Sequence, residues 1–253
     1  MSSGNWGLYV HIPFCPQVCP YCSFAVTTFR PRLHERYVRA VCAELEMHRA
    51  LAVRGPLDTV YFGGGTPTLL APRLLGRLLE RARECLGIKE DAALTVEANP
   101  EAADTARFAQ LRVLGFNRLS LGVQSFADQS LRLLGRQHSG AQAEAACRAA
   151  RQAGFGNLSL DLILAIPAAL PQEWEYSLER ALEQGPEHLS TYALTIEEGT
   201  PFARQERQGR LTPLPEEEQA QAYEGGVARL EEAGFEHYEV SNFAHPGFRS
   251  RHN

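Results

Sequence analysis

Short apolar segments alternate with longer helical patterns along most of the 253-residue chain. The helical segments repeat apolar residues every three or four positions, as in residues 32–51 and 71–87. Consecutive strands separated by helices run parallel, because a parallel connection needs a long crossover. The alternation therefore predicts an α/β fold, either an open sheet or a barrel. The six predicted strands are residues 7–13, 58–64, 93–100, 116–126, 157–167 and 188–197.

This fold class also predicts where functional residues lie. In parallel barrels and open parallel sheets, ligands bind at the carboxyl ends of the strands, in the loops that lead to the helices. After residue 200 the alternation becomes irregular. Residues 221–235 predict a helix that is interrupted at Gly225 and Gly226, and residues 237–248 predict a strand and a turn.

The composition excludes several classes of protein. A net charge of −5 argues against a nucleic-acid-binding surface, which would need a basic face. The first ten residues lack the charged and apolar regions of a signal peptide, and no apolar run has the length of a membrane span. We therefore expect a cytoplasmic protein whose six cysteines do not form disulfides. Cys42, Cys85 and Cys147 lie singly in helical segments and are expected to be small buried side chains.

The other three cysteines, Cys15, Cys19 and Cys22, lie within eight residues of a proline-containing loop after the first predicted strand. Thiolates at these spacings can point toward a common centre. A structural zinc site would need a fourth protein ligand, for which His11 is the nearest candidate. An iron–sulfur cubane would take one thiolate per iron and would keep one iron open for another ligand. The residues alone leave both interpretations possible, as well as idle thiols.

A glycine-rich loop and four polar residues accompany the later strands. Gly63, Gly64 and Gly65 follow the second strand without the spacing of a dinucleotide-binding loop or of a P-loop, so a plain turn and a phosphate-binding loop are both possible. Asp161 interrupts an apolar run, where an unpaired carboxylate would be costly. Because polar residues recur near the ends of successive strands, we predict that they line one pocket. These residues are Glu97, Gln124, Arg136 and Asp161.

The cysteine spacing C-x3-C-x2-C, with Tyr21 before the last cysteine, resembles the signature of the radical S-adenosylmethionine (SAM) superfamily. This resemblance implies a [4Fe-4S] cluster on Cys15, Cys19 and Cys22, whose open iron binds the amino and carboxylate groups of SAM. It also implies reductive cleavage of the sulfonium to a 5′-deoxyadenosyl radical. The cofactor would supply the chemistry, and the protein would position it.

Within that superfamily, the segments LYVHIPFC, GGGTPT, VEANP, GVQSF, LGRQH and DLI resemble the oxygen-independent coproporphyrinogen III oxidase family. This resemblance implies a partial (β/α)6 TIM-like barrel over residues 1–200, followed at 201–253 by the start of a truncated C-terminal region. It implies that SAM contacts Tyr9, Gly64, Gly65, Thr66, Glu97, Gln124, Arg136 and Asp161, with weaker correspondences at Tyr21 and Ala193.

The same family contains enzymes and heme chaperones. The coproporphyrinogen dehydrogenases carry a further cysteine two residues after the cluster motif, where this chain has Phe24. An aromatic residue there resembles the HemW-type chaperones, which implies heme as cargo, hemoproteins as acceptors and an electron donor such as a flavodoxin. His252 and Asn253 match the beginning of the chaperones' His-Asn-x-x-Tyr-Trp motif, so His252 is the candidate heme ligand. Coproporphyrinogen dehydrogenation and a zinc-stapled binding module remain alternatives.

One position departs from the family pattern. Ala165 stands where family members generally carry glycine, in the loop after the fifth predicted strand. Because alanine has fewer allowed backbone conformations than glycine, this loop and the aim of Asp161 could differ from the family arrangement.

Overall fold

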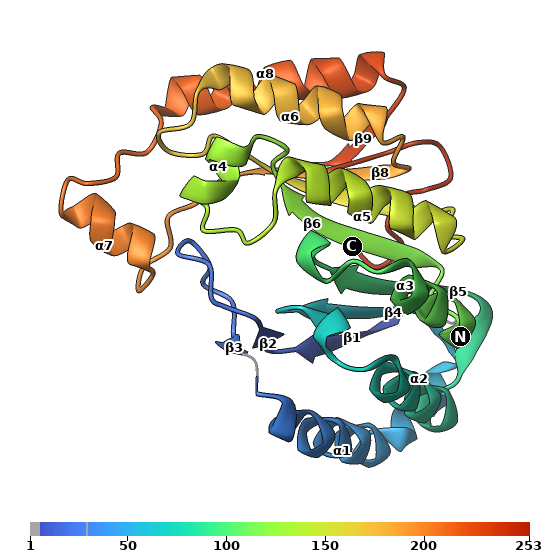
Figure 1. Cartoon of the computed structure of the whole chain (residues 1–253). Coiled ribbons are helices and arrows are strands. Elements are labelled where there is room, and N and C mark those ends of the chain that lie inside the picture. Colours follow the sequence, from blue (N-terminus) through green and yellow to red (C-terminus); the bar gives the residue numbers. More distant parts are fainter. Residues whose placement is uncertain (1–5, 29) are drawn as a thin grey trace.

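The computed structural model describes residues 6–28 and 30–253. Its main element is an eight-stranded sheet in the order β1-β4-β5-β6-β7-β8-β10-β9 (Figure 1). The first six strands in this order are parallel, and β10 and β9 continue the sheet antiparallel. The strands are β1 (Gly7–Ile12), β4 (Leu57–Gly64), β5 (Ile88–Ala98), β6 (Arg118–Gln124), β7 (Leu158–Leu164), β8 (His188–Ala193), β9 (Glu236–Glu239) and β10 (Asn242–Ala244).

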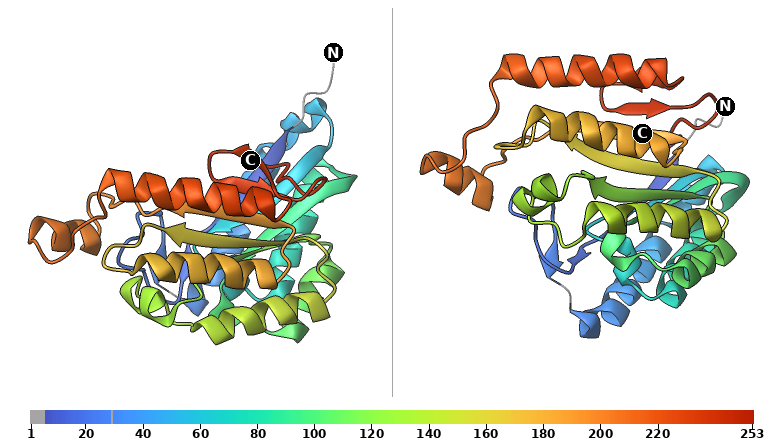
Figure 2. Two further views of the ribbon diagram at one scale, coloured as in Figure 1. Left: turned by 90° about the horizontal axis from the view of Figure 1, so that it is seen from above. Right: turned by 45° about the horizontal axis from the view of Figure 1, so that its top comes forward.

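Helices cover the outer face of this curved sheet, which gives the predicted half-barrel (Figure 1). Adjacent helices contact one another around the outside: α1 contacts α2, α2 contacts α3, and α3 contacts α5. The same layer ends with α6 and α8, which pack together over β7 (Figure 2). The helices are α1 (Pro31–Met47), α2 (Pro72–Leu86), α3 (Thr105–Leu114), α4 (Asp128–Leu133), α5 (Gly140–Gln152), α6 (Pro171–Glu183), α7 (Pro201–Arg207) and α8 (Glu216–Glu232).

Local sequence signals fix several of these helix ends. Helix α3 begins at Asp104, whose side chain accepts hydrogen bonds from the amides of Ala106 and Arg107. Helix α5 begins with a capping box in which Ser139 and Gln142 bond each other's backbone amides. Helix α3 ends at Gly115, which takes the left-handed conformation that terminates helices.

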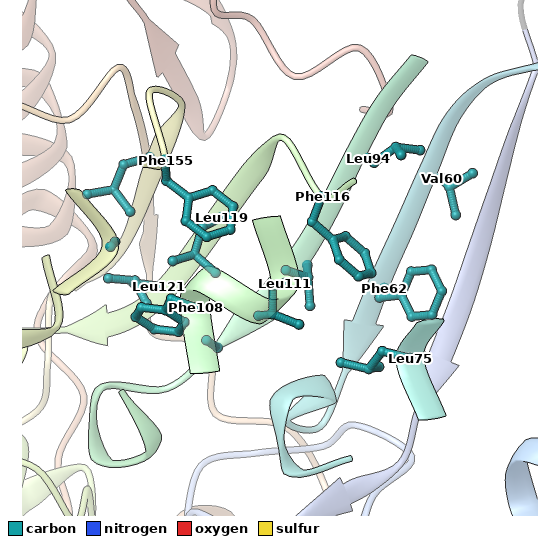
Figure 3. Packing of buried hydrophobic residues seen from close by; sticks show 14 of the residues in the cluster. Val60, Phe62, Leu75, Leu94, Phe108, Leu111, Phe116, Leu119, Leu121 and Phe155 are labelled. Carbon is teal, nitrogen blue, oxygen red and sulfur yellow. The ribbon is translucent and has the colours of Figure 1, made fainter. Parts of the chain in front are cut away.

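The apolar core lies between the sheet and the helices. In β4, Val60 and Phe62 point outward and are fully buried, and Phe116 meets Phe62 edge to face with ring centroids 5.2 Å apart. Figure 3 shows the side chains of this layer filling the space between strands and helices. Labelled members of the layer are Val60, Phe62, Leu75, Leu94, Phe108, Leu111, Phe116, Leu119, Leu121 and Phe155.

The alternate residues of the same strands point into the half-barrel, and they are mostly polar. The register pairs Glu97 with Ser120, and Asp161 with Ser190. Hydrogen bonds join such residues on neighbouring strands, for example from the Ser120 hydroxyl on β6 to Asp161 on β7 at 3.2 Å. Layers of bulky branched residues usually fill the interior of a (β/α)8 barrel. In this chain the interior of the half-barrel is instead lined by polar side chains such as Glu97, Ser120, Asp161 and Ser190. We call this interior the chamber.

The C-terminal segment lies across the half-barrel. Arg251 forms ion pairs with Asp58 and Asp91, near the amino ends of β4 and β5. The His252 ring is stacked on Tyr61 of β4, with ring centroids 5.1 Å apart, and its Nδ1 lies 2.7 Å from the Thr59 hydroxyl. The segment after β10, which lies near one edge of the sheet, therefore contacts β4 and β5 near the other edge.

One prediction about this part of the chain is wrong. Gly225 and Gly226 do not interrupt a helix, because α8 is continuous from Glu216 to Glu232. Gly226 faces α6, where a side-chain Cβ would lie 3.0 Å from the Trp174 ring. Glycine here permits close packing of the two helices. No helix in the described part of the chain is long and apolar enough to span a membrane.

Ala165 takes the conformation that glycine prefers, with φ of +57° just after β7. Strand β7 nevertheless keeps its register with β8 as far as Leu164, so Asp161 still points into the chamber. The left-handed conformation costs an L-residue roughly 1–2 kcal/mol.

We therefore expect Ala165→Gly to raise the free energy of unfolding by about 1 kcal/mol, measured by urea denaturation. Ala149→Gly, inside helix α5, is the matched control and should lower it by a similar amount. A destabilised Ala165→Gly variant would contradict the strain at this position.

Candidate functional site

The three-cysteine loop begins where β1 ends. Its two ends are held together by the short parallel strands β2 (Phe14–Cys15) and β3 (Thr27–Thr28). Inside the loop, the Cys22 amide donates to the Cys19 carbonyl at 3.1 Å. His11 anchors the loop from the strand, because its Nε2 donates to the Ala25 carbonyl at 2.8 Å. His11 therefore supports the backbone of the loop through Nε2, and its other ring nitrogen, Nδ1, lies 3.4 Å from the Tyr9 hydroxyl.

The glycine-rich turn after β4 packs directly beneath this loop. The Gly65 amide donates to the Ile12 carbonyl, and the Thr66 amide donates to the Phe14 carbonyl, both at 2.8 Å. A Cβ at Gly65 would lie 2.7 Å from the Phe14 carbonyl oxygen and 2.9 Å from the Cys15 sulfur. Only glycine permits this approach. Gly65 therefore does more than form a turn, because it lets the cysteine loop pack against the end of β4.

All three thiols line one pocket of about 490 Å³ at the carboxyl ends of the parallel strands. Thr66 donates to the Cys15 sulfur at 4.0 Å. Burial raises the pKa of Cys15 to about 11, so this thiol would ionise at neutral pH only on binding a metal. Among residues 6–28 and 30–253, no three His, Cys, Asp or Glu side chains converge on a single metal ion. A cubane takes each thiolate on a different iron, so it does not require such convergence.

Arg136 connects the cysteine loop to the strand ends. Its guanidinium donates to the Cys19 sulfur at 3.8 Å, to the Asn99 side-chain oxygen at 2.8 Å and to the Gly122 carbonyl at 3.0 Å. It also pairs with Glu101 at 3.7 Å. The side chain is almost fully buried, so this positive charge is held beside one of the three sulfurs.

Glu97, at the end of β5, faces the pocket. The Tyr61 hydroxyl donates to it at 2.8 Å and the Gly64 amide donates at 3.1 Å. Burial and the neighbouring charge of Asp161 raise the pKa of Glu97 to about 7, against the opposing effect of these hydrogen bonds and of Arg118. Glu97 and Asp161 thus form a carboxylate pair that would attract a cationic ligand.

Asp161 and Gln124 complete the floor and one wall of the pocket. Asp161 lies in the middle of β7, not at its end, and burial raises its pKa. Gln124 takes a left-handed backbone conformation, with φ of +67°, and accepts a hydrogen bond from Tyr192 at 3.1 Å. Strained backbone of this kind often occurs at functional sites.

The structure brings most of the predicted site residues together. Tyr9 and Thr66 are not part of the pocket lining: Tyr9 lies beside the chamber, 48% exposed, and Thr66 is buried behind Cys15. His252 lies beneath the pocket against Tyr61. The predicted residues that line the pocket are Cys15, Cys19, Cys22, Tyr21, Gly64, Gly65, Glu97, Gln124, Arg136, Asp161 and Ala193.

Other pocket residues were not among the predicted ones. Asn99, Tyr61 and Ser190 all line the pocket. Asn99 falls two residues after Glu97, Tyr61 lies between the apolar residues Val60 and Phe62, and Ser190 follows Leu189. The polar–apolar alternation in strands that are expected to be buried on both faces was the signal that could have identified them.

Comparisons with known proteins agree with this geometry. Residues 9–181 match the model of the radical SAM superfamily. A protein of Synechocystis sp. described as heme chaperone HemW is 42% identical over all of this chain and 63% of its own length. The mouse mitochondrial protein named radical S-adenosyl methionine domain-containing protein 1 is 40% identical over all of this chain and 57% of its own length.

Among solved structures, coproporphyrinogen III oxidase (HemN) from Escherichia coli, described as a radical SAM enzyme, superposes with a TM-score of 0.83 and 29% sequence identity. The superposition covers 96% of this chain and 56% of that protein. This chain therefore spans less than two thirds of the length of these relatives.

The close approach of Gly65 to the cysteine loop can be tested by substitution. We expect Gly65→Ala to lose most of its iron and sulfide after anaerobic reconstitution, because the added Cβ would displace Phe14 and Cys15. The measurements are iron and sulfide content and the visible absorbance of the cluster. Gly156→Ala is the control, since nothing lies within 4 Å of its Cβ position, and it should reconstitute normally. Equal iron content in the two variants would contradict the packing argument.

The raised pKa of Glu97 predicts a pH-dependent stability. A carboxyl group whose pKa rises from 4.5 to about 7 on folding stabilises the folded state at low pH, and this contribution is lost as the pH rises through 7. Relative to wild type, Glu97→Gln should therefore gain up to about 3 kcal/mol in the free energy of unfolding between pH 5 and 8, at about 1.4 kcal/mol per pKa unit.

The measurement is urea denaturation across that pH range. Glu101→Gln is the matched control, because the pKa of Glu101 is lowered by its hydrogen bond with His138 and by the charge of Arg136, against its burial. The contribution of Glu101 to the free energy of unfolding has reached its full value by about pH 5. It should therefore stay constant at higher pH. If the free energies of unfolding of wild type and Glu97→Gln change in parallel with pH, the pKa of Glu97 is not raised by folding.

Proposed function

This chain belongs to the radical SAM superfamily, in the branch of the HemW-type heme chaperones, and we propose that it is the cluster- and SAM-binding core of such a chaperone. The proposal covers the whole protein's activity, of which this chain spans only a part. It rests on the three-thiol pocket, on Phe24 and on the position of His252. The expected setting is the cytoplasm, where the six free cysteines stay reduced.

In this proposal Cys15, Cys19 and Cys22 hold a [4Fe-4S] cluster at the pocket rim. When bound, the cluster supplies an open iron for SAM and the electron for its reductive cleavage. The chain's own contribution is to hold the thiols in position. Gly65 allows the loop to approach β4, Arg136 places a positive charge at the Cys19 sulfur, and Thr66 bonds the Cys15 sulfur.

The pocket has the size and charge for a sulfonium nucleoside. Its volume of about 490 Å³ lies in the range of small-molecule sites. SAM carries an ammonium and a sulfonium, and the Glu97–Asp161 pair offers negative charge to them. Gln124 and Ala193 would contribute polar and backbone contacts to the nucleoside, and Tyr21 would close the side toward the cysteine loop.

Phe24 is the observation that favours a chaperone over a dehydrogenase. It lines the pocket two residues after Cys22, at the place of the additional cysteine of the dehydrogenases, and its side chain is 67% exposed. A phenylalanine cannot serve as a thiolate ligand there. Its apolar ring at the pocket mouth would suit contact with the flat apolar face of a porphyrin.

His252 is the proposed heme ligand. Its Nδ1 is hydrogen-bonded to the Thr59 hydroxyl, which leaves Nε2 as the nitrogen for iron and orients the ring. Burial lowers the pKa of His252, so the imidazole is neutral and able to coordinate a metal at physiological pH. Heme bound there would be passed to acceptor hemoproteins, and a flavodoxin-type donor would reduce the cluster.

The chaperone proposal can be separated from coproporphyrinogen dehydrogenation in one assay. The reconstituted protein is incubated anaerobically with SAM, reductant and either coproporphyrinogen III or heme. We expect heme uptake, seen as a shift of the Soret band, and no protoporphyrinogen. Formation of protoporphyrinogen would overturn the proposal in favour of the dehydrogenase. Stoichiometric zinc without iron or sulfide in anaerobically purified protein would favour the zinc-stapled module instead.

The role of His252 predicts a specific loss. His252→Ala should weaken heme binding at least about tenfold, because the axial bond is removed, while cluster content stays unchanged. His48→Ala is the control: His48 is an exposed histidine at the end of α1. Heme titration followed by absorbance measures both. Equal heme affinities for the two variants would remove His252 from the heme site.

A further inference from the structure

Arg118, the first residue of β6, is buried in the chamber below the pocket. Its side chain points to the same side of β6 as Ser120, and only 4% of its surface is exposed. Its Nε has no hydrogen-bond partner among the described residues. A buried guanidinium is costly unless nearby negative charge offsets the loss of water. The nearby negative charge is on the two pocket carboxylates.

The charge of Arg118 reaches groups on several strands of the half-barrel. Burial raises the pKa of Asp161, and Arg118 opposes this more strongly than the hydrogen bonds from Ser190 and Ser120 do. Arg118 also affects a histidine: burial and the charge of Arg118 lower the pKa of His188, in β8, to about 3. His188 is therefore neutral at physiological pH. Of the two neighbouring side chains, His188 and Arg118, only Arg118 carries a positive charge.

We propose that Arg118 is a positioning residue whose positive charge favours the ionised forms of Asp161 and Glu97, so that they can bind a cationic ligand in the pocket. It does not line the pocket, so it acts through the carboxylates that do. This inference rests on the proposed binding of SAM only for the identity of the ligand. The other titratable or charged groups that face the two carboxylates are Tyr9, Tyr61, Arg136 and Tyr192.

These other groups cannot replace Arg118. The three tyrosines are neutral at physiological pH, because burial raises each of their pKa values. Arg136 is engaged with Asn99, Glu101 and the Cys19 sulfur at the pocket rim. Without Arg118, Asp161 would lose the largest of the effects that favour its charged form, while Glu97 would keep its hydrogen bonds from Tyr61 and Gly64. The two carboxylates would then share a desolvated site, and one of them would take up a proton.

The first test does not involve SAM. The ionisation of the carboxyl groups in the cluster-loaded protein is followed by the infrared C=O band of protonated carboxyls as the pH is changed. Glu97→Gln and Asp161→Asn assign the signals. We expect Arg118→Met to move the midpoints upward by about one pH unit or more, and Arg118→Lys to restore most of the shift. If both carboxyls of the wild type are protonated at pH 8, the proposal is overturned, whether or not the variants fold.

The second test measures the dissociation constant of SAM across pH 6 to 9. In Arg118→Met, binding should weaken about tenfold near pH 7, where a carboxylate is lost, and should recover at pH 9, where both are charged again. A structural defect would instead weaken binding at every pH. Arg107→Met is the matched control, since Arg107 lies on α3 and donates to the Leu70 carbonyl.

The two tests fail separately. If SAM does not bind the wild-type protein, the proposed ligand is wrong, and the infrared titration still decides the role of Arg118. If SAM binds with the same pH profile in wild type and Arg118→Met, Arg118 does not set the charge of the pocket. A shifted profile in Arg107→Met as well would show that the effect is not specific to the chamber, and would also overturn the proposal.

Discussion

The polar face of the parallel strands is the constraint on which the rest of the structure depends. Parallel strands covered by helices are usually apolar on both faces, and the inside of a (β/α)8 barrel is normally packed with branched residues. Here the outward residues, such as Val60 and Phe62, form the core, and the inward residues, such as Tyr61 and Glu97, are polar. Six parallel strands leave a half-barrel with a hollow interior, so these inward side chains can hydrogen-bond to one another and still face a ligand.

This arrangement separates stability from function along each strand. The free energy of folding comes mainly from the outer layer, where apolar side chains leave water at roughly 25 cal/mol per Å². The inner layer opposes folding, because burial raises the pKa values of Glu97 and Asp161. Sites that bind charged ligands commonly keep such costs, because the ligand then meets groups already desolvated and oriented. The chamber is tolerated because the outer layer is continuous from α1 to α8.

Sequence patterns predicted the fold class and all six parallel strands, and several of the predicted site residues line the pocket. Parallel topology follows from the order of strands and helices, and the carboxyl ends of parallel strands meet at one edge, so Cys15, Gly65 and Glu97 had to lie near one another. Strand β5 begins five residues before the predicted start, at Ile88, because its charged first residues gave no strand signal. The role of Arg118 was also hidden. A charged residue at the start of a strand usually faces solvent, whereas Arg118 is buried.

The chamber also brings the two proposed sites into contact. Tyr61 donates its hydroxyl proton to Glu97 and carries the His252 ring on its face, so one side chain borders both the pocket and the candidate heme ligand. Any ligand that moves His252 changes the burial of Tyr61, and any ligand that changes the charge of Glu97 changes the strength of its hydrogen bond. Thermodynamic linkage requires that any coupling through Tyr61 changes the affinities of both sites by the same factor. Tyr61 is thus the side chain through which the pocket carboxylate Glu97 and the C-terminal segment on β4 are connected.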